Sequence, residues 1–204
     1  MNPNQKKVRI KPFLFIGLGN PGPKYAETRH NAGFWFLERL AECGGQPLKA
    51  QSKLQVESVK TSLWGHDCIL ARPTTFMNHS GQAVRAVLDD YKLEASGLLV
   101  AYDELDLPPG VARLKQGGGH GGHNGLRDIF RHTTDQGFIR LRIGIGHPGI
   151  KEAVTPWVLS RPGAEQERLI RQSITDAMED MPKMLDGDLP GAMKQLHTEK
   201  TDGL

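Results

Sequence analysis

The stretch from Phe13 to Gly33, with the sequence FLFIGLGNPGPKYAETRHNAG, constrains the fold of this chain more than any other. Its first four residues are apolar and predict a short buried strand, which runs into a loop rich in glycine and proline. His30 then stands just before an amphipathic run that predicts a helix from Asn31 to about Gly44. A strand end, a rigid loop and a histidine at a helix start predict the floor of an active site at one edge of a sheet.

The glycines of this loop also suggest a dinucleotide site, because Gly17-x-Gly19-x-x-Gly22 has the spacing of the dinucleotide fingerprint. That fingerprint needs a helix that begins at once and an acidic residue at the end of the next strand. Pro21 interrupts the turn, and Glu38 lies inside the predicted helix rather than at a strand end. The pattern therefore favours a different use of the loop.

His30 is expected at the amino end of a helix dipole, which disfavours the imidazolium and keeps the ring neutral, as a general base requires. Position alone favours a simpler role, in which the ring only satisfies a cap or a loop carbonyl. The decision between the two depends on which other groups the fold brings to His30.

The chain has 204 residues, enough for one domain, which we expect to span residues 12–197 between a flexible basic arm (1–11) and a flexible tail (198–204). The net charge of +3 is compatible with an anionic partner. Cys43 and Cys68 are too few for a disulfide framework or a zinc knuckle, so a reducing cytoplasm is expected. No apolar run approaches the roughly 20 residues that span a bilayer, and the N-terminus lacks the apolar core of a signal peptide.

A carboxylate follows the apolar run 98–102, which predicts a buried strand with Asp103 at its carboxyl end. Ligands of open α/β sheets gather at that end, so Asp103 is well placed to act. A solvated turn or a cation site is the alternative for the acidic cluster that it opens. Metal binding is disfavoured, because no ligand stands at helical spacing beside the cluster, and His120 and His123 lack a third ligand in their glycine-rich loop.

Basic residues alternate along two predicted strands, 111–115 and 138–145, and so share one face of each strand. They are Arg113, Lys115, Arg140 and Arg142. The pattern predicts either a phosphate cradle or a solvated basic face, and both remain open. The glycine-rich loop between the strands lacks the Lys-Ser/Thr pair of a P-loop, which excludes nucleoside triphosphate binding.

Other patterns fill in the predicted fold. Residues 54–62 and 67–71 predict a hairpin that turns at Trp64-Gly65. Asn78 or Ser80 is expected to cap a helix that runs to about Tyr91. A long helix is predicted over 164–185, followed by a mixed, polar tail.

One histidine, one carboxylate and three loop asparagines form a set suited to hydrolysis. The chain has neither a Gly-x-Ser-x-Gly elbow nor a zinc-protease helix, so water is the expected nucleophile. His30 would deprotonate it, while Asp103 holds the tautomer. The amides of Asn20, Asn78 and Asn124 can donate to an oxyanion or pair with a peptide backbone. An ester suits this set better than an amide, because its alcohol leaves readily.

Five segments of the chain resemble bacterial peptidyl-tRNA hydrolases in sequence, order and spacing. They are GLGNPGPKYAETRHNAG, RPTTFMNHSGQAV, DELDLPPG, KQGGGHGGHNGLRDI and RLRIGIGHPG, across residues 13–150. The resemblance implies a single-domain three-layer α/β/α sandwich on a mixed, mostly parallel sheet. It implies a cytoplasmic monomer without metal or cofactor that cleaves the ester between peptide and tRNA, recycling tRNA from aborted or stalled translation. The substrate contacts would be the acceptor arm and 3′ end of the tRNA.

The resemblance also implies roles for individual residues. His30 matches the catalytic base, Asp103 its partner, and Asn20 the position that distinguishes N-blocked peptidyl-tRNA from free aminoacyl-tRNA. Tyr25 and Phe76 match aromatic positions near the 3′ end of the substrate, and Asn78 and Asn124 match positions that hold its carbonyl or the water. The family's phosphate-binding basic positions are matched by Arg113, Lys115 and Arg142. His79 departs from the family pattern, and the chain before Lys11 and after about Glu152 resembles the family only loosely. The alternative is a catalytically idle RNA-binding relative.

Overall fold

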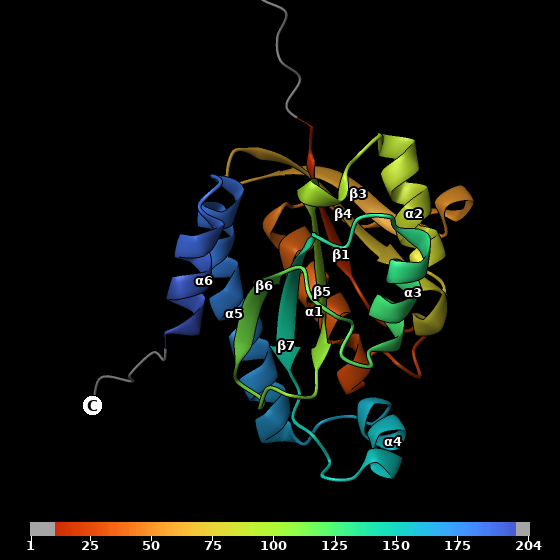
Figure 1. Cartoon of the computed structure of the whole chain (residues 1–204), viewed down its shortest axis with the longest axis vertical. Helices are drawn as coiled ribbons and strands as arrows, with labels where there is room; N and C mark the ends of the chain where they lie inside the picture. The colour runs from red at the N-terminus through yellow and green to blue at the C-terminus, as the bar shows by residue number, and fades with distance from the viewer. Residues whose placement is uncertain (1–10, 199–204) are drawn as a thin grey trace, which may run out of the picture.

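The computed structural model describes residues 11–198, so the predicted arm and tail lie outside the described residues except for Lys11 and Thr198. A seven-stranded sheet runs through its centre in the order β2-β3-β4-β1-β5-β7-β6 (Figure 1). The strands are β1 (Phe13–Gly17), β2 (Lys49–Gln51), β3 (Val56–Leu63), β4 (His66–Pro73), β5 (Leu98–Glu104), β6 (Ala112–Gln116) and β7 (Ile139–Gly144).

The sheet is mixed, as the resemblance implied. Strands β4, β1, β5 and β7 are parallel neighbours, whereas β2, β3 and β6 join at the two edges through antiparallel pairs. The predicted hairpin is present, and Trp64 and Gly65 turn it with positive φ angles. The parallel centre brings four strand ends to one edge of the sheet, where ligands of such folds bind.

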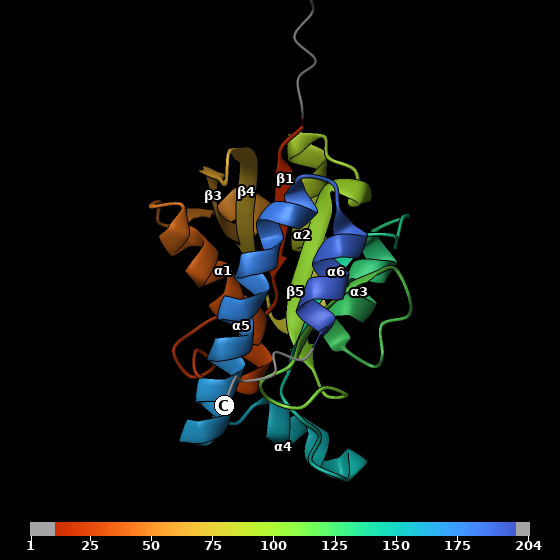
Figure 2. The ribbon, with the colours of Figure 1, turned by 90° about the vertical axis from the view of Figure 1, so that its left-hand side faces the viewer.

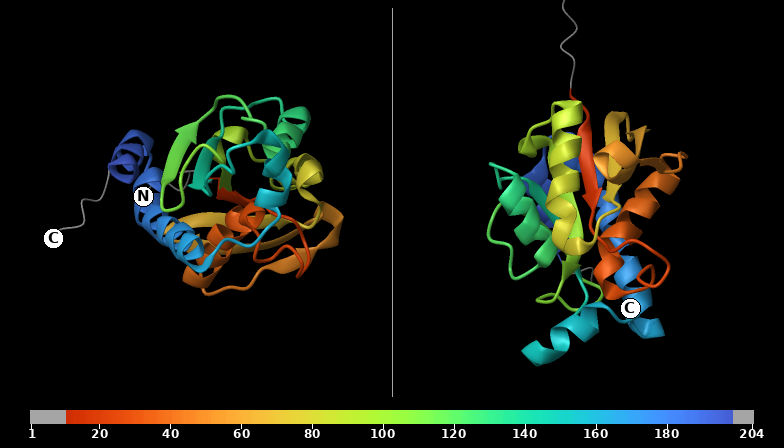
Figure 3. Two further views of the ribbon diagram at one scale, coloured as in Figure 1. Left: turned by 90° about the horizontal axis from the view of Figure 1, so that it is seen from below. Right: turned by 90° about the vertical axis from the view of Figure 1, so that its right-hand side faces the viewer.

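Helices cover both faces of the sheet, which makes the predicted three layers. The helices are α1 (Ala32–Cys43), α2 (Ser80–Tyr91), α3 (Asn124–His132), α4 (Val154–Val158), α5 (Ala164–Leu185) and α6 (Leu189–His197). Helices α1, α5 and α6 lie on one face (Figure 2), and α2 and α3 lie on the other (Figure 3). Helix α4 covers neither face and lies beyond the carboxyl ends of the strands (Figure 1). None of the helices in residues 11–198 is long and apolar enough to cross a membrane.

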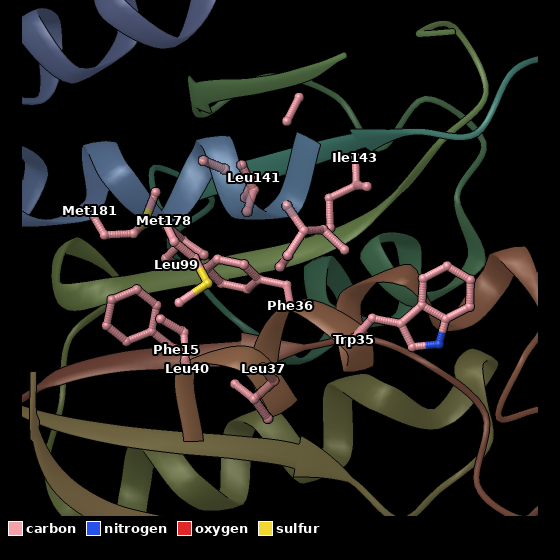
Figure 4. Close-up of a cluster of buried hydrophobic side chains, with 14 of the residues drawn as sticks. Phe15, Trp35, Phe36, Leu37, Leu40, Leu99, Leu141, Ile143, Met178 and Met181 are labelled. Carbon is pink, nitrogen blue, oxygen red and sulfur yellow. The ribbon is translucent and has the colours of Figure 1, made fainter. Parts of the chain in front are cut away.

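Successive side chains of the central strands point to opposite faces of the sheet, and each face has its own hydrophobic core. Phe15 points to the α1 side, where it packs with Phe36, Leu99 and Met178 (Figure 4). Its neighbours on β1 point to the α2–α3 side and are fully buried there. Because odd positions of β5 face α1, Asp103 is directed to the side on which α1 begins.

Two glycines explain why α1 begins so close to the sheet. A Cβ on Gly17 would lie 2.3 Å from the carbonyl oxygen of Gly33, and a Cβ on Gly33 would lie 2.3 Å from that of Ala101. The backbone of α1 therefore packs directly against the backbone of β1 and β5.

An eleven-residue loop, 18–28, separates β1 from the first 3₁₀ turn, η1 (Arg29–Asn31). The loop is therefore not the immediate strand-to-helix turn of a dinucleotide site.

Some local expectations are wrong. Asn31 is the N-cap residue of α1, as predicted, but its side chain bonds to the preceding loop and not to the helix. Neither Asn78 nor Ser80 caps the second helix, because α2 follows a 3₁₀ turn, η3 (Met77–His79), and His79 is its N-cap residue. The polar tail contains α6, whose first turn is capped by the carboxylate of Asp188. Asp188 followed by Pro190 is a helix-start pattern that could have revealed α6.

Candidate active site

The carboxyl ends of the parallel strands surround one pocket of about 540 Å³. Loops after β1 and β4, the end of β5, the start of α3 and helix α4 all contribute to its wall. The side chains and backbone that line it belong to Asn20, Tyr25, His30, Phe76, Met77, Asn78, Asp103, Glu104, Leu105, Gly121, Gly122, His123, Asn124, Val154, Thr155, Val158 and Leu159. The pocket therefore brings together the predicted base and its carboxylate with five other predicted site residues, which are Asn20, Tyr25, Phe76, Asn78 and Asn124.

His30 and Asp103 are 73 positions apart in sequence and meet at the floor of the pocket. Nδ1 of His30 lies 2.8 and 2.9 Å from the two carboxylate oxygens of Asp103. Asp103 is 3% exposed and His30 is 8% exposed, so the pair is shielded from solvent on all sides except the pocket. With a proton on Nδ1 donated to the carboxylate, Nε2 of His30 is left as the acceptor that can take a proton.

His123 makes a third member of this cluster, which the sequence interpretation considered only as a metal ligand. Its Nδ1 accepts the backbone N–H of Leu126 at 3.3 Å, so Nδ1 carries no proton. The proton is on Nε2, which donates to Oδ1 of Asp103 at 3.0 Å. The carboxylate thus accepts from two histidines. The signal in sequence was the position of His123 directly before α3, where a side chain can cap a helix.

Electrostatics favour a charged carboxylate and a basic imidazole. Burial lowers the pKa of His30, but the charge of Asp103 and its hydrogen bond raise that pKa by more, so the net shift is upward. Burial raises the pKa of Asp103, while His30 and His123 together hold it well below its usual range. The helix-dipole argument therefore had the wrong sign for His30, because the contact with Asp103 outweighs it.

His30, Asp103 and His123 are also the one group in the described residues with three ligand atoms close enough for a metal ion. The donor set is chemically suitable, but the same atoms are already hydrogen-bonded to one another. An ion would have to replace the proton on Nε2 of His123. Nδ1 of the same ring would then need a proton, although it now accepts a hydrogen bond from the backbone N–H of Leu126. The hydrogen-bonding pattern fits a proton-transfer site better than a metal site.

Asn20 is held in one orientation by its neighbours. Its side-chain oxygen accepts the backbone N–H of Met77 at 2.9 Å. Its backbone N–H donates to Oδ1 of Asn31 at 2.8 Å, and its backbone carbonyl accepts from Nδ2 of Asn31 at 3.0 Å. Because the oxygen is engaged, the –NH₂ group is the part of the Asn20 side chain that can reach a substrate. Asn31, which the sequence interpretation treated as a helix cap, instead holds Asn20.

The other predicted contacts lie around the pocket mouth. The rings of Tyr25 and Phe76 meet edge to face with centroids 6.2 Å apart, and Phe76 is 54% exposed. Asn78 is exposed, and Asn124 accepts a hydrogen bond from Arg127 through its side-chain oxygen. His79, which departs from the family pattern, contacts Asn78 but does not line the pocket.

The basic residues have three different environments. Arg113 and Lys115 are exposed on the edge strand β6. Arg142 is paired with Glu104 at 2.9 Å, and burial lowers its pKa less than Glu104 raises it. Arg140 is 1% exposed and donates to the carbonyls of Gly118 and Gly119, so it anchors the glycine-rich loop instead of facing solvent.

The comparisons with known proteins agree on one family. A sequence profile of the family described as peptidyl-tRNA hydrolase matches residues 14–203, so the likeness continues well past Glu152, contrary to our expectation. The peptidyl-tRNA hydrolase of Halorhodospira halophila is 50% identical over 90% of this chain and 95% of its own length. That of Azotobacter vinelandii is 53% identical over 92% and 97%. The crystal structure of the Acinetobacter baumannii enzyme matches with a TM-score of 0.89 and 47% identity, covering 92% of this chain and 95% of that one.

Proposed function

The chain belongs to the peptidyl-tRNA hydrolase family, and on that premise we propose how it cleaves the ester between peptide and tRNA. His30 is the general base, Asp103 holds and charges it, and water is the nucleophile. The observation that carries the proposal is the contact of Nδ1 of His30 with a buried carboxylate at the floor of the pocket, which leaves Nε2 as the acceptor. The same pair argues against an idle RNA-binding relative, which would have no use for a buried base.

The reaction follows from this geometry. Nε2 of His30 removes a proton from water as the oxygen attacks the ester carbonyl, and the Asp103 carboxylate stabilises the imidazolium that forms. Amide N–H groups at the pocket, those of Asn78 and Asn124, donate to the carbonyl oxygen as it gains charge. The bond from the carbonyl carbon to the ribose oxygen then breaks, and the imidazolium returns the proton to that oxygen. Free peptide and tRNA leave, and the histidine is neutral again.

The orientation of Asn20 supplies a reason for selectivity. Its –NH₂ group can donate to the carbonyl of an N-blocked residue in the pocket, whereas a free ammonium has only donors and would meet another donor. We therefore expect N-acetylaminoacyl-tRNA to be cleaved and the unblocked aminoacyl-tRNA to be spared. Hydrolysis of the two substrates, charged on the same tRNA, measures this directly.

The variant Asn20→Asp sharpens that test. A carboxylate would attract the ammonium, so the ratio of blocked to unblocked cleavage should fall by roughly tenfold or more, the scale of one unmatched polar contact. The control is Gln46→Glu, which makes the same amide-to-carboxylate change at an exposed position just beyond the carboxyl end of α1. It should leave the ratio unchanged. Equal cleavage of both substrates by the unaltered enzyme would contradict the proposed function.

Binding of tRNA is proposed to involve the exposed basic edge at Arg113 and Lys115. We expect Lys115→Ala to reduce the slope of log affinity against log salt by about one, because one phosphate contact is lost. The control is Lys53→Ala, whose lysine is exposed beside the opposite edge of the sheet. Replacing Arg142, already neutralised by Glu104, should reduce the slope less. An unchanged slope for Lys115→Ala would remove this residue from the tRNA contact surface.

The setting of the enzyme is part of the same proposal. We assign it to the cytoplasm as a monomer, acting on peptidyl-tRNA from aborted or stalled translation. One observation supports the compartment: Cys43 and Cys68 are both free thiols, as is usual for proteins in a reducing environment.

A further inference from the structure

Arg29, directly before the proposed base, is an unusual residue to find buried. It is 4% exposed, and burial lowers its pKa. The acceptors that surround its guanidinium are neutral: three backbone carbonyls, the hydroxyl of Ser160 and the side-chain amide of Gln166. A buried arginine normally has an acidic partner, so these neutral contacts call for another explanation.

The carbonyls that Arg29 binds belong to the end of helix α4 and the residues just after it. Nη1 donates to the carbonyl oxygens of residues 157, 160 and 161 at 3.2–3.3 Å and to the hydroxyl of Ser160 at 2.7 Å. The guanidinium also stacks on Trp157, with its carbon 3.7 Å from the ring centroid. One of these carbonyls, that of Trp157, is in the last turn of α4, and the other two belong to the segment that leaves the helix. Arg29 therefore ties both the end of α4 and the chain after it to η1.

Helix α4 depends on such contacts more than the other helices do. It has five residues, too few to be stable alone. It lies outside the layers of the fold (Figures 1 and 3), and apart from its own preceding turn the element it packs against most is η1, which contains Arg29. Two further hydrogen bonds hold it, from the Trp157 indole to Gly146 and from the Arg29 backbone to Ser160.

Residues of α4 also line the pocket. Val154, Val158 and Leu159, with Leu105 and the single polar residue Thr155, form a mainly apolar wall there. An apolar wall suits the peptide of the substrate, because the nucleotide end is polar and charged.

We propose that Arg29 is a positioning residue, which fixes α4 as the peptide-side wall of the pocket and so determines affinity for the acyl group. The inference rests on the proposed function, since it presupposes a peptidyl substrate. The two adjacent residues thus have different roles. His30 performs the proton transfer, whereas Arg29 holds α4 in place without touching the reacting atoms.

Steady-state kinetics with two substrates test the inference. Both carry the same tRNA, one with N-acetylleucine and one with an N-acetylated leucine tripeptide. For Arg29→Met we expect KM for the tripeptide substrate to rise about tenfold, as when apolar pocket contacts are lost. KM for the short substrate and both kcat values should stay within roughly threefold, because binding changes and chemistry does not. Arg39→Met, at an exposed arginine on α1, should leave every constant unchanged.

A double-mutant cycle with Val158→Ala shows whether Arg29 acts through α4. In the unaltered enzyme this variant should raise KM for the tripeptide substrate, whereas in the Arg29→Met background it should add little, because α4 is already displaced. Multiplicative effects, an equal KM rise for both substrates, or a fall in kcat alone would overturn the inference. If Arg29→Met does not fold, Ser160→Ala should show the same selective KM rise at smaller size, and its absence would likewise overturn it. Failure of the unaltered enzyme to cleave either substrate would instead count against the proposed function.

Discussion

Replacing His30 with alanine should lower the turnover of peptidyl-tRNA by roughly 10²–10⁴-fold, the usual contribution of a general base. His123, the other histidine that lines the pocket, cannot take over, because its Nδ1 is engaged by Leu126 and its Nε2 by Asp103. Binding of tRNA should persist, because the basic residues proposed to bind it lie on β6, whereas His30 lies in η1. Single-turnover cleavage and equilibrium tRNA binding, measured on the same preparation, separate the two effects.

Two further variants make this result interpretable. His30→Gln keeps an amide donor for the buried carboxylate, so it should be as inactive as His30→Ala while retaining more stability. His66→Ala removes a histidine that pairs with Asp186 at the amino end of β4, the edge of the sheet away from the pocket, and should be fully active. Near-normal cleavage by either His30 variant would contradict the assignment of the base.

The second large effect is expected for Asp103→Asn, with a loss of roughly 10²–10⁴-fold in the rate of cleavage, as for other carboxylates that hold a catalytic imidazole. The carboxylate now accepts N–H groups from both His30 and His123. An asparagine has one oxygen for two donors, so its –NH₂ would oppose one of them or turn His30 into the tautomer with the proton on Nε2. Single-turnover rates measure the loss. Asp106→Asn, at an exposed acid after β5, is the matched control and should be neutral.

Much of the fold and part of the site followed from local patterns. Asp103 could be placed because an apolar run predicted its strand, and ligand sites lie at the carboxyl ends of such strands. The amphipathic run likewise placed His30 directly before a helix, as the structure shows at η1 and α1. The long helix α5 was predicted with its observed bounds because its apolar period is regular and a Pro-Gly pair precedes it.

The missed features depend on partners that are far apart in sequence. Nothing local distinguishes Arg29 or Arg140, both buried, from the exposed Arg113. Asn31 looks like a helix cap by position, and only the returning loop shows that it holds Asn20 instead. The direction of the pKa shift of His30 was predicted wrongly, because the helix-dipole argument left out the charge of Asp103, 73 positions away.

The pH dependence of kcat/KM tests the pairing of His30 with Asp103 most directly. The base must be neutral to act, so activity should rise with pH through the pKa of His30. Because Asp103 raises that pKa, the midpoint should lie above the ordinary value of about 6.5 in the unaltered enzyme. Asp103→Asn removes the charge that stabilises the imidazolium, so its residual activity should show a midpoint at lower pH. A midpoint that is the same in both enzymes, or higher in the variant, would contradict the account.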